Sequence, residues 1–166
     1  MLVIGYGNPG RLDDGLGPAF AAAVEQLGVP GVAVDADYQL SVEDAAAIAT
    51  HDVVIFADAA VTGAEPFSFT RITPKHALSF STHSIEPEAV LALANGVFGA
   101  TARGYALGIR GYLFNEFGEA ISKDAQRNLA AAVSALEPVL RARTFEELAS
   151  RFEVGSNAVA MRTGGE

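Results

Sequence analysis

The chain has 166 residues, half of them apolar, which suits one domain with a sizeable hydrophobic core. Acidic residues outnumber basic ones by 20 to 11, and the net charge of −9 argues against nucleic acid or an anionic membrane as a partner. The lack of cysteine excludes disulfides, thiolate metal sites, iron–sulfur clusters and cysteine nucleophiles. The sequence shows no leader pattern and no apolar stretch of transmembrane length, so we expect a cytoplasmic protein.

The first part of the chain alternates strand-like and helix-like patterns. Gly28 follows apolar residues at helical spacing and is typical of a helix end. Asp44 stands three residues after Ser41, as in a capping box with a shorter acid, so we expect Ser41 to start a helix. The expected elements are a strand at 2–6, a helix at 16–27, a strand at 32–35, the helix from Ser41 and a buried strand at 52–58.

The second part of the chain continues the alternation. Thr144 and Glu147 form a second capping box, which predicts a short last helix ending near Phe152. The Gly- and Ser-containing end, residues 154–166, is expected to be a mobile tail. The expected elements are a more exposed strand at 67–72, a polar loop at 73–85, a helix at 87–97, a strand at 105–112 and a long helix at 125–140 with Ser122 before it.

Strands that alternate with helices through short turns indicate the α/β class. We expect a three-layer sandwich around a mostly parallel, mixed central sheet of about five strands. The chain shows no internal repeat and no linker, so residues 1–153 are predicted to form a single domain, followed by the tail at 154–166.

Acidic residues follow two of the expected strands. In a doubly wound sheet the ligand crevice lies beyond the carboxyl ends of strands, where the winding direction reverses. With the first strand central, that crevice lies between the first and third strands, so Asp13 or Asp14 should converge with Asp58. Structural roles are also open: either of the first two acids could cap the helix that begins near Gly15, and Asp58 could accept a loop hydrogen bond.

Three histidines are available as further ligands or bases. His51 and His76 lie in polar turns and are expected at the surface. His83 lies between apolar residues just before an expected helix, where a histidine alone is more often packed or capping. Two carboxylates and one imidazole would nevertheless form an O,O,N site suited to a first-row divalent ion.

The segment Gly5–Gly10 matches the dinucleotide fingerprint G-x-G-x-x-G after a strand. The helix, however, opens only after Asp13 and Asp14, which would put negative charge where a pyrophosphate needs a positive helix end. Pro9 also removes one backbone N–H that a phosphate would use. The context therefore argues against nucleotide binding.

The same residues resemble a protease family. Gly5-Tyr6-Gly7-Asn8 followed by Asp13-Asp14-Gly15-Leu16-Gly17 resembles the G-x-G-N and D-D/E-G-x-G opening of the hydrogenase maturation endopeptidases. The segment 55–59, Ile-Phe-Ala-Asp-Ala, resembles the family's apolar strand that ends in Asp-Ala, and 81–84, Ser-Thr-His-Ser, resembles its polar lead into a histidine. Three motifs in order, within a likeness that spans about residues 2–140, make the resemblance specific.

Further segments resemble one branch of that family. Tyr38-Gln39-Leu40, Glu43-Asp44-Ala45 and the stretch 108–112, Gly-Ile-Arg-Gly-Tyr, are similar to the branch that serves NAD(P)-linked or bidirectional hydrogenases. The family fold is an α/β sandwich with a mainly parallel mixed sheet, and members usually act as monomers.

The resemblance implies a function. Members remove a short C-terminal extension from the large-subunit precursor of a nickel–iron hydrogenase, with the nickel already in that precursor as recognition element. The family's metal-contacting and catalytic groups fall on Asp14, Asp58 and His83, although several members have Glu at the first position. Asn8 and Asp13 are expected to position these groups without contacting the metal. The implied partner is the precursor, and the implied nickel is carried by that precursor.

The implied reaction is hydrolysis of one peptide bond without a Cys or Ser nucleophile. The metal could polarise the scissile carbonyl or acidify a water, or a carboxylate could act as general base, and the sequence leaves these routes open. Arg110 could touch the substrate peptide, but a salt bridge to surface acids is the preferred interpretation.

Two other functions remain. The opening 4–10 also resembles that of bacterial peptidyl-tRNA hydrolase, but the chain has no histidine before His51, and its acidity suits tRNA poorly. A protein that docks the nickel-loaded precursor without cutting it, as a metallochaperone, would use the same three side chains. Mass analysis of the precursor separates this last alternative from a protease.

Overall fold

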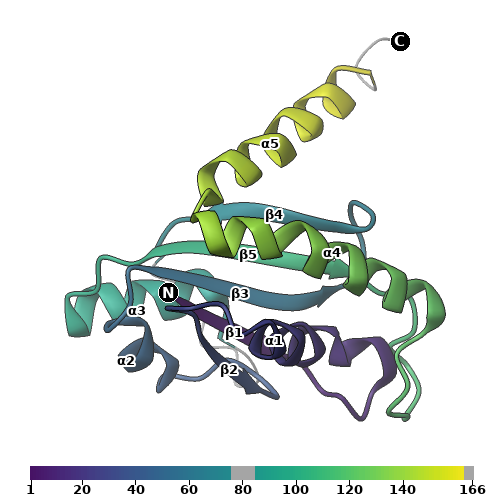
Figure 1. Ribbon diagram of the computed structural model, residues 1–166, viewed down its shortest axis with the longest axis horizontal. Helices are drawn as coiled ribbons and strands as arrows, with labels where there is room; N and C mark the ends of the chain where they lie inside the picture. The colour runs from purple at the N-terminus through teal and green to yellow at the C-terminus, as the bar shows by residue number, and fades with distance from the viewer. Residues whose placement is uncertain (76–84, 163–166) are drawn as a thin grey trace.

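The structure is a computed structural model that describes residues 1–75 and 85–162, with side chains through Glu153. Five strands form one sheet in the order β2-β1-β3-β5-β4 (Figure 1). Neighbouring strands are parallel except at β4, which runs antiparallel to β5 at one edge. The strands are β1 Leu2–Tyr6, β2 Ala33–Asp37, β3 Val53–Ala60, β4 Phe67–Ile72 and β5 Arg103–Arg110.

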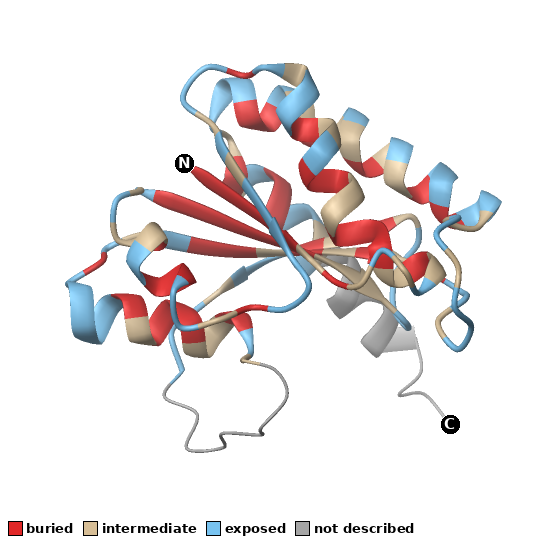
Figure 2. Cartoon of the chain, turned by 90° about the horizontal axis from the view of Figure 1, so that it is seen from below, coloured by how far each residue is buried: buried red, intermediate tan, exposed pale blue. Residues whose placement is uncertain are grey.

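Helices cover both faces of this sheet, which confirms the predicted three-layer α/β sandwich (Figure 2). One face carries α1, α4 and the first part of α5, and the other carries α2 and α3. In the described ranges, no helix combines the length and apolarity needed to cross a bilayer. The helices are η1 Leu12–Gly15 (a 3-10 turn), α1 Leu16–Leu27, α2 Asp44–Ile48, α3 Pro87–Phe98, α4 Lys123–Ala142 and α5 Phe145–Arg162.

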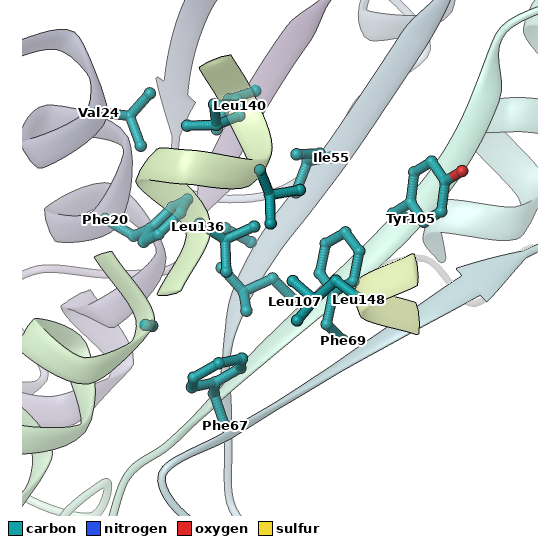
Figure 3. Packing of buried hydrophobic residues seen from close by; sticks show 14 of the residues in the cluster. Phe20, Val24, Ile55, Phe67, Phe69, Tyr105, Leu107, Leu136, Leu140 and Leu148 are labelled. Atoms are coloured by element: carbon teal, nitrogen blue, oxygen red, sulfur yellow. The ribbon is translucent and has the colours of Figure 1, made fainter. Parts of the chain in front are cut away.

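The two hydrophobic cores follow from the alternation of side chains along the strands. In β3, Val53 and Ile55 belong to the core under α1 and α4, whereas Val54 and Phe56 belong to the core under α2 and α3. The larger core, shown in Figure 3, joins β3, β4 and β5 to three helices. Because β1 and β3 are buried on both faces, they read as continuous apolar runs in the sequence.

The connection order confirms the predicted switch point. Strand β1 pairs with β2 on one side and β3 on the other, both parallel. The chain therefore winds one way from β1 to β2 and the other way to β3, and in sheets of this kind ligands bind beyond the carboxyl ends of the two strands at such a point.

Several element boundaries differ from the predictions. Strand β3 extends to Ala60, past the expected end at Asp58, because β5 pairs with it along its whole length. The carboxylate of Asp44 accepts from the N–H of Ser41 at 2.7 Å, as the predicted capping box requires. Helix α2 nevertheless begins only at Asp44 and is shorter than predicted. Helix α5 continues to Arg162, well past the expected end near Phe152.

Candidate active site

Glycines bring η1 and α1 against the ends of β1 and β3. A Cβ on Gly17 would lie 2.2 Å from the carbonyl oxygen of Tyr6 and 2.5 Å from that of Ala57. Gly7 has a φ of +135°, and a Cβ there would lie 2.1 Å from the carbonyl oxygen of Asp14. Only glycine permits these approaches. The two G-x-G patterns, at 5–7 and 15–17, therefore place Asp14 at the switch-point edge of the sheet.

Asp14 is half-buried in η1 and is held by the turn after β1. The N–H of Asn8 donates to Oδ2 of Asp14 at 3.0 Å, and the side-chain oxygen of Asn8 accepts from the N–H of Gly10 at 2.9 Å. Asn8 thus closes the turn with its side chain and orients the carboxylate with its backbone. The N-cap of α1 is Gly15, so the alternative that Asp13 or Asp14 caps this helix is wrong.

Asp58 lies inside β3 rather than after it, but at the point where its neighbour β1 has finished pairing. The β1–β3 register ends at Gly5 and Ala57, whereas Asp58 pairs on its other side with Gly108 of β5. Its Oδ1 accepts from the N–H of Ala59 at 2.7 Å, a donor within β3 and not in a loop as the structural alternative expected. The Tyr6 hydroxyl, at the end of β1, is a second hydrogen-bond partner of the carboxyl.

The pKa of Asp58 is raised to about 6. Burial is the largest cause and the negative charges of Asp14 and Glu86 add to it, whereas the hydrogen bonds from Ala59 and Tyr6 lower the pKa. Asp14 is therefore one of the charges that act on Asp58, although the two residues come from different elements. A carboxyl with a pKa near neutrality, next to a second carboxyl, is typical of functional sites.

The sequence analysis missed two neighbours of Asp58. Burial, followed by the charge of Asp58, raises the pKa of the Tyr6 hydroxyl. Glu86 is the N-cap residue of α3 and acts on Asp58 through its charge. The signal for Tyr6 was strand alternation, since it follows Ile4 by two residues and therefore shares the α2–α3 face with Phe56.

Asp13 is completely buried and has a different set of partners. Its carboxylate accepts from the N–H groups of Tyr112, Leu113 and Ser122 at 2.7–3.0 Å and from the Ser122 hydroxyl at 2.8 Å. Although burial alone would raise the pKa of Asp13, these donors outweigh it and lower the pKa. Asp13 therefore fixes the segment between β5 and α4, and Ser122 in turn caps α4.

The three histidines and Arg110 are the remaining candidates. His83 and His76 lie outside the described residues, and His51 lies just before β3, at the edge opposite Asp58. Within residues 1–75 and 85–162, no group of three or more potential metal ligands is found. The Arg110 guanidinium donates to the carbonyl of Val61 and lies 5.3 Å from the Tyr112 ring centre; the described ion pairs do not include the salt bridge expected for it.

A cavity of about 260 Å³ adjoins the turn after β1. It lies between that turn, the start of α1 and the end of β2, and is large enough for a side chain of a bound peptide. Its lining residues are Gly7, Pro9, Pro18, Ala36, Asp37 and Tyr38.

No family model and no curated protein matches the chain. Among solved structures, the NiFe hydrogenase maturation protease HycI from Thermococcus kodakarensis KOD1 is similar with a TM-score of 0.66 and 22% identity, covering 84% of this chain and 91% of that one. The hydrogenase maturating endopeptidase HybD from E. coli has a TM-score of 0.66 and 22% identity, covering 86% and 93%. Hydrogenase 2 maturation peptidase from Thaumarchaeota archaeon SCGC_AB-539-E09 has a TM-score of 0.61 and 20% identity, covering 84% and 97%. The chain therefore has the fold that these hydrogenase maturation proteases share.

Proposed function

We propose that the protein is an endopeptidase that removes a short C-terminal extension from the nickel-loaded large-subunit precursor of a nickel–iron hydrogenase. The likeness in fold to solved hydrogenase maturation proteases over more than four fifths of the chain supports this proposal. The sequence motifs support it independently, because two of the three lie in the described residues and bring Asp14 and Asp58 to the switch-point edge of the sheet. The proposal includes action in the cytoplasm as a monomer.

The observation that carries the proposal is the shared environment of Asp14 and Asp58. The two carboxyls come from η1 and β3, and the negative charge of Asp14 is one of the causes that raise the pKa of Asp58 to about 6. A cation bound here would be favoured, because its positive charge offsets the negative charge that acts on Asp58 and stabilises the ionised form of that carboxyl. A metal ion carried by the substrate would therefore be recognised here.

In this proposal Asp14, Asp58 and His83 complete the coordination of the nickel that the precursor carries. His83 precedes Glu86 by three residues in the sequence, and Glu86 is close enough to Asp58 to affect its pKa. Carboxylate oxygens with one imidazole nitrogen suit a divalent first-row ion. Asn8 and Asp13 hold the surrounding backbone and do not contact the metal.

The reaction is hydrolysis of the peptide bond beside the nickel. Water adds to the scissile carbonyl, the C–N bond breaks and the departing amine takes a proton. Two routes can activate the water: the precursor's nickel polarises the carbonyl or acidifies the water, or a carboxylate that is free of the metal accepts its proton. On the second route Asp58 is the base instead of a nickel ligand, since a carboxyl with a pKa of about 6 is ionised in large part at neutral pH.

The experiment is the intact mass of a large-subunit precursor before and after incubation with this protein. We expect loss of one defined C-terminal peptide from the nickel-loaded precursor and no loss from the nickel-free one. Precursors of NAD(P)-linked and of other nickel–iron hydrogenases are compared in parallel, because segments of the sequence resemble the branch that serves the former. Stable binding without a change in mass would instead establish the docking protein as the better description.

A further inference from the structure

Exposed apolar side chains gather at the carboxyl edge of the sheet. Phe117 is 93% exposed and Leu113 is 50% exposed in the segment after β5, and Val61, directly after β3, is 62% exposed. These positions follow β3, the strand that carries Asp58, and its parallel neighbour β5. Single exposed apolar residues are ordinary, but several beside a candidate site mark an interaction surface.

The loop formed by residues 112–118 is firmly attached to the segment before Asp14. The N–H of Leu12 donates to the carbonyl of Gly118 at 2.7 Å, and the N–H of Gly118 donates to the carbonyl of Gly10 at 3.0 Å. Asp13 adds its N–H bond to the carbonyl of Leu113 and the carboxylate bonds described above. Figure 1 shows this loop and the η1 segment side by side at the end of the molecule opposite α3.

This attachment matters for binding. A loop that already has the bound conformation loses little conformational entropy when a partner covers it. The hydrogen bonds use the backbone of the loop and of η1, so they leave the ring of Phe117 in solvent. Phe117 is thus a large aromatic side chain on a loop whose conformation is already fixed. Residues that dominate the binding energy of protein interfaces are often of this kind.

The charge around this surface defines the partner. Glu116 and Glu119 flank Phe117 in the sequence, and Glu65 accepts a hydrogen bond from the Tyr112 hydroxyl at 2.8 Å. The segment 112–122 contains no Lys or Arg. The guanidinium groups of Arg11 and Arg110 donate to the carbonyls of Phe114 and Val61 and keep their positive charge, so the acidic character is confined to the exposed Glu116 and Glu119 around Phe117. The complementary surface is an apolar patch with Lys or Arg opposite these two carboxylates.

We propose that residues 112–118, together with Val61, form a docking surface for a folded protein substrate that presents an apolar patch with a basic border. The inference rests on the proposed function, since it takes this partner to be the precursor that is cleaved. The surface lies beside the carboxylates rather than among them, so it binds substrate and transition state equally. It should therefore affect KM and Kd but leave kcat unchanged.

The test compares two double variants of the full chain. Phe117→Ser with Leu113→Ser removes the docking surface, and Val97→Ser with Phe98→Ser removes a similarly exposed apolar pair from the end of α3 at the opposite edge, where the exposed fractions are 64% and 50%. Kd for the nickel-loaded precursor is measured by titration calorimetry, and kcat and KM are measured from the cleavage time course. Circular dichroism and thermal melting establish that both variants are folded.

We expect the loop variant to raise Kd and KM about ten-fold or more at unchanged kcat, and the α3 variant to behave as wild type. Equal Kd and KM in the loop variant and wild type would overturn the docking proposal while cleavage by wild type still upheld the proposed function. Failure of wild type to cleave the precursor it binds would overturn the function alone. A wild type that neither binds nor cleaves it would overturn both. A dimeric wild type with a monomeric loop variant would assign this surface to a second copy and also overturn the proposal.

Discussion

Asp13 and Asp14 are consecutive in the chain, yet their carboxylates bind different segments of the protein. Oδ2 of Asp14 accepts from the N–H of Asn8, in the turn after β1, whereas the carboxylate of Asp13 accepts from Tyr112 and from Ser122 before α4. The pair therefore ties the candidate site to the loop at 112–118. Replacing the two residues separately should have separate consequences.

Replacing Asp13 by Asn is expected to destabilise the fold by about 2–4 kcal/mol. The amide group puts a donor where the carboxylate accepts from the Ser122 N–H and hydroxyl and from the N–H groups of Tyr112 and Leu113. Urea unfolding measures the change, and Asp124→Asn, an exposed acid at the start of α4, serves as the matched control. A loss no larger than that of the control would contradict the role assigned to Asp13.

The contribution of Asp13 should also depend on pH. Its pKa is lower in the folded chain than the ordinary value of 3.8 in the unfolded chain, so the folded chain binds fewer protons at acidic pH. The stabilisation is therefore complete above about pH 4 and is lost as pH falls through the folded pKa. The difference in unfolding free energy between wild type and Asp13→Asn should shrink below that pH.

Asp58 should show the opposite pH dependence in the metal-free protein. Its pKa is raised from 3.8 to about 6, so its favourable contribution exists below pH 3.8 and is lost as pH rises through 6. Asp58→Asn is therefore expected to stabilise the fold by about 1–2 kcal/mol at pH 8 and by little near pH 4. Urea unfolding at both pH values measures this, and equal effects at the two would contradict the shifted pKa.

The close approach of α1 to the strand ends predicts a sharp difference between two glycines. Gly17→Ala would push a methyl group against the carbonyl oxygens of Tyr6 and Ala57 and should cost about 3 kcal/mol or more. Gly96→Ala, on the exposed side of α3 with no atom within 4 Å of the new Cβ, should stabilise by about 0.5–1 kcal/mol. Thermal unfolding of both variants checks the prediction, which fails if their effects are similar.

Most of the fold could be predicted because its signals are local. The apolar runs of β1 and β3 are continuous since both strands are buried on both faces, and Gly28 ends α1 with a left-handed φ of 57°. The end of β3 could not be predicted in the same way. The end of β3 depends on β5, because the two strands pair as far as Ala60. The sequence of β3 alone gives no information about how long β5 is.

The candidate site was predictable in part for the same reason. The convergence of Asp14 with Asp58 follows from the order of strands, which alternating elements suggest. The role of Asp13 depends on partners about a hundred residues away, and the charge of Glu86 reaches Asp58 from another element. Such long-range pairs leave no periodic signal. The placement of His83 stays a prediction.

The most direct test of the central claim is cleavage of the nickel-loaded precursor by Asp14→Asn and Asp58→Asn, followed by intact mass. Asp35→Asn, an exposed acid on β2 outside the site, is the matched control. The account predicts that both site variants are folded and lose cleavage, about a hundred-fold or more, whereas the control cleaves as wild type. Cleavage at the wild-type rate by either site variant would remove that carboxylate from the reaction and contradict the account.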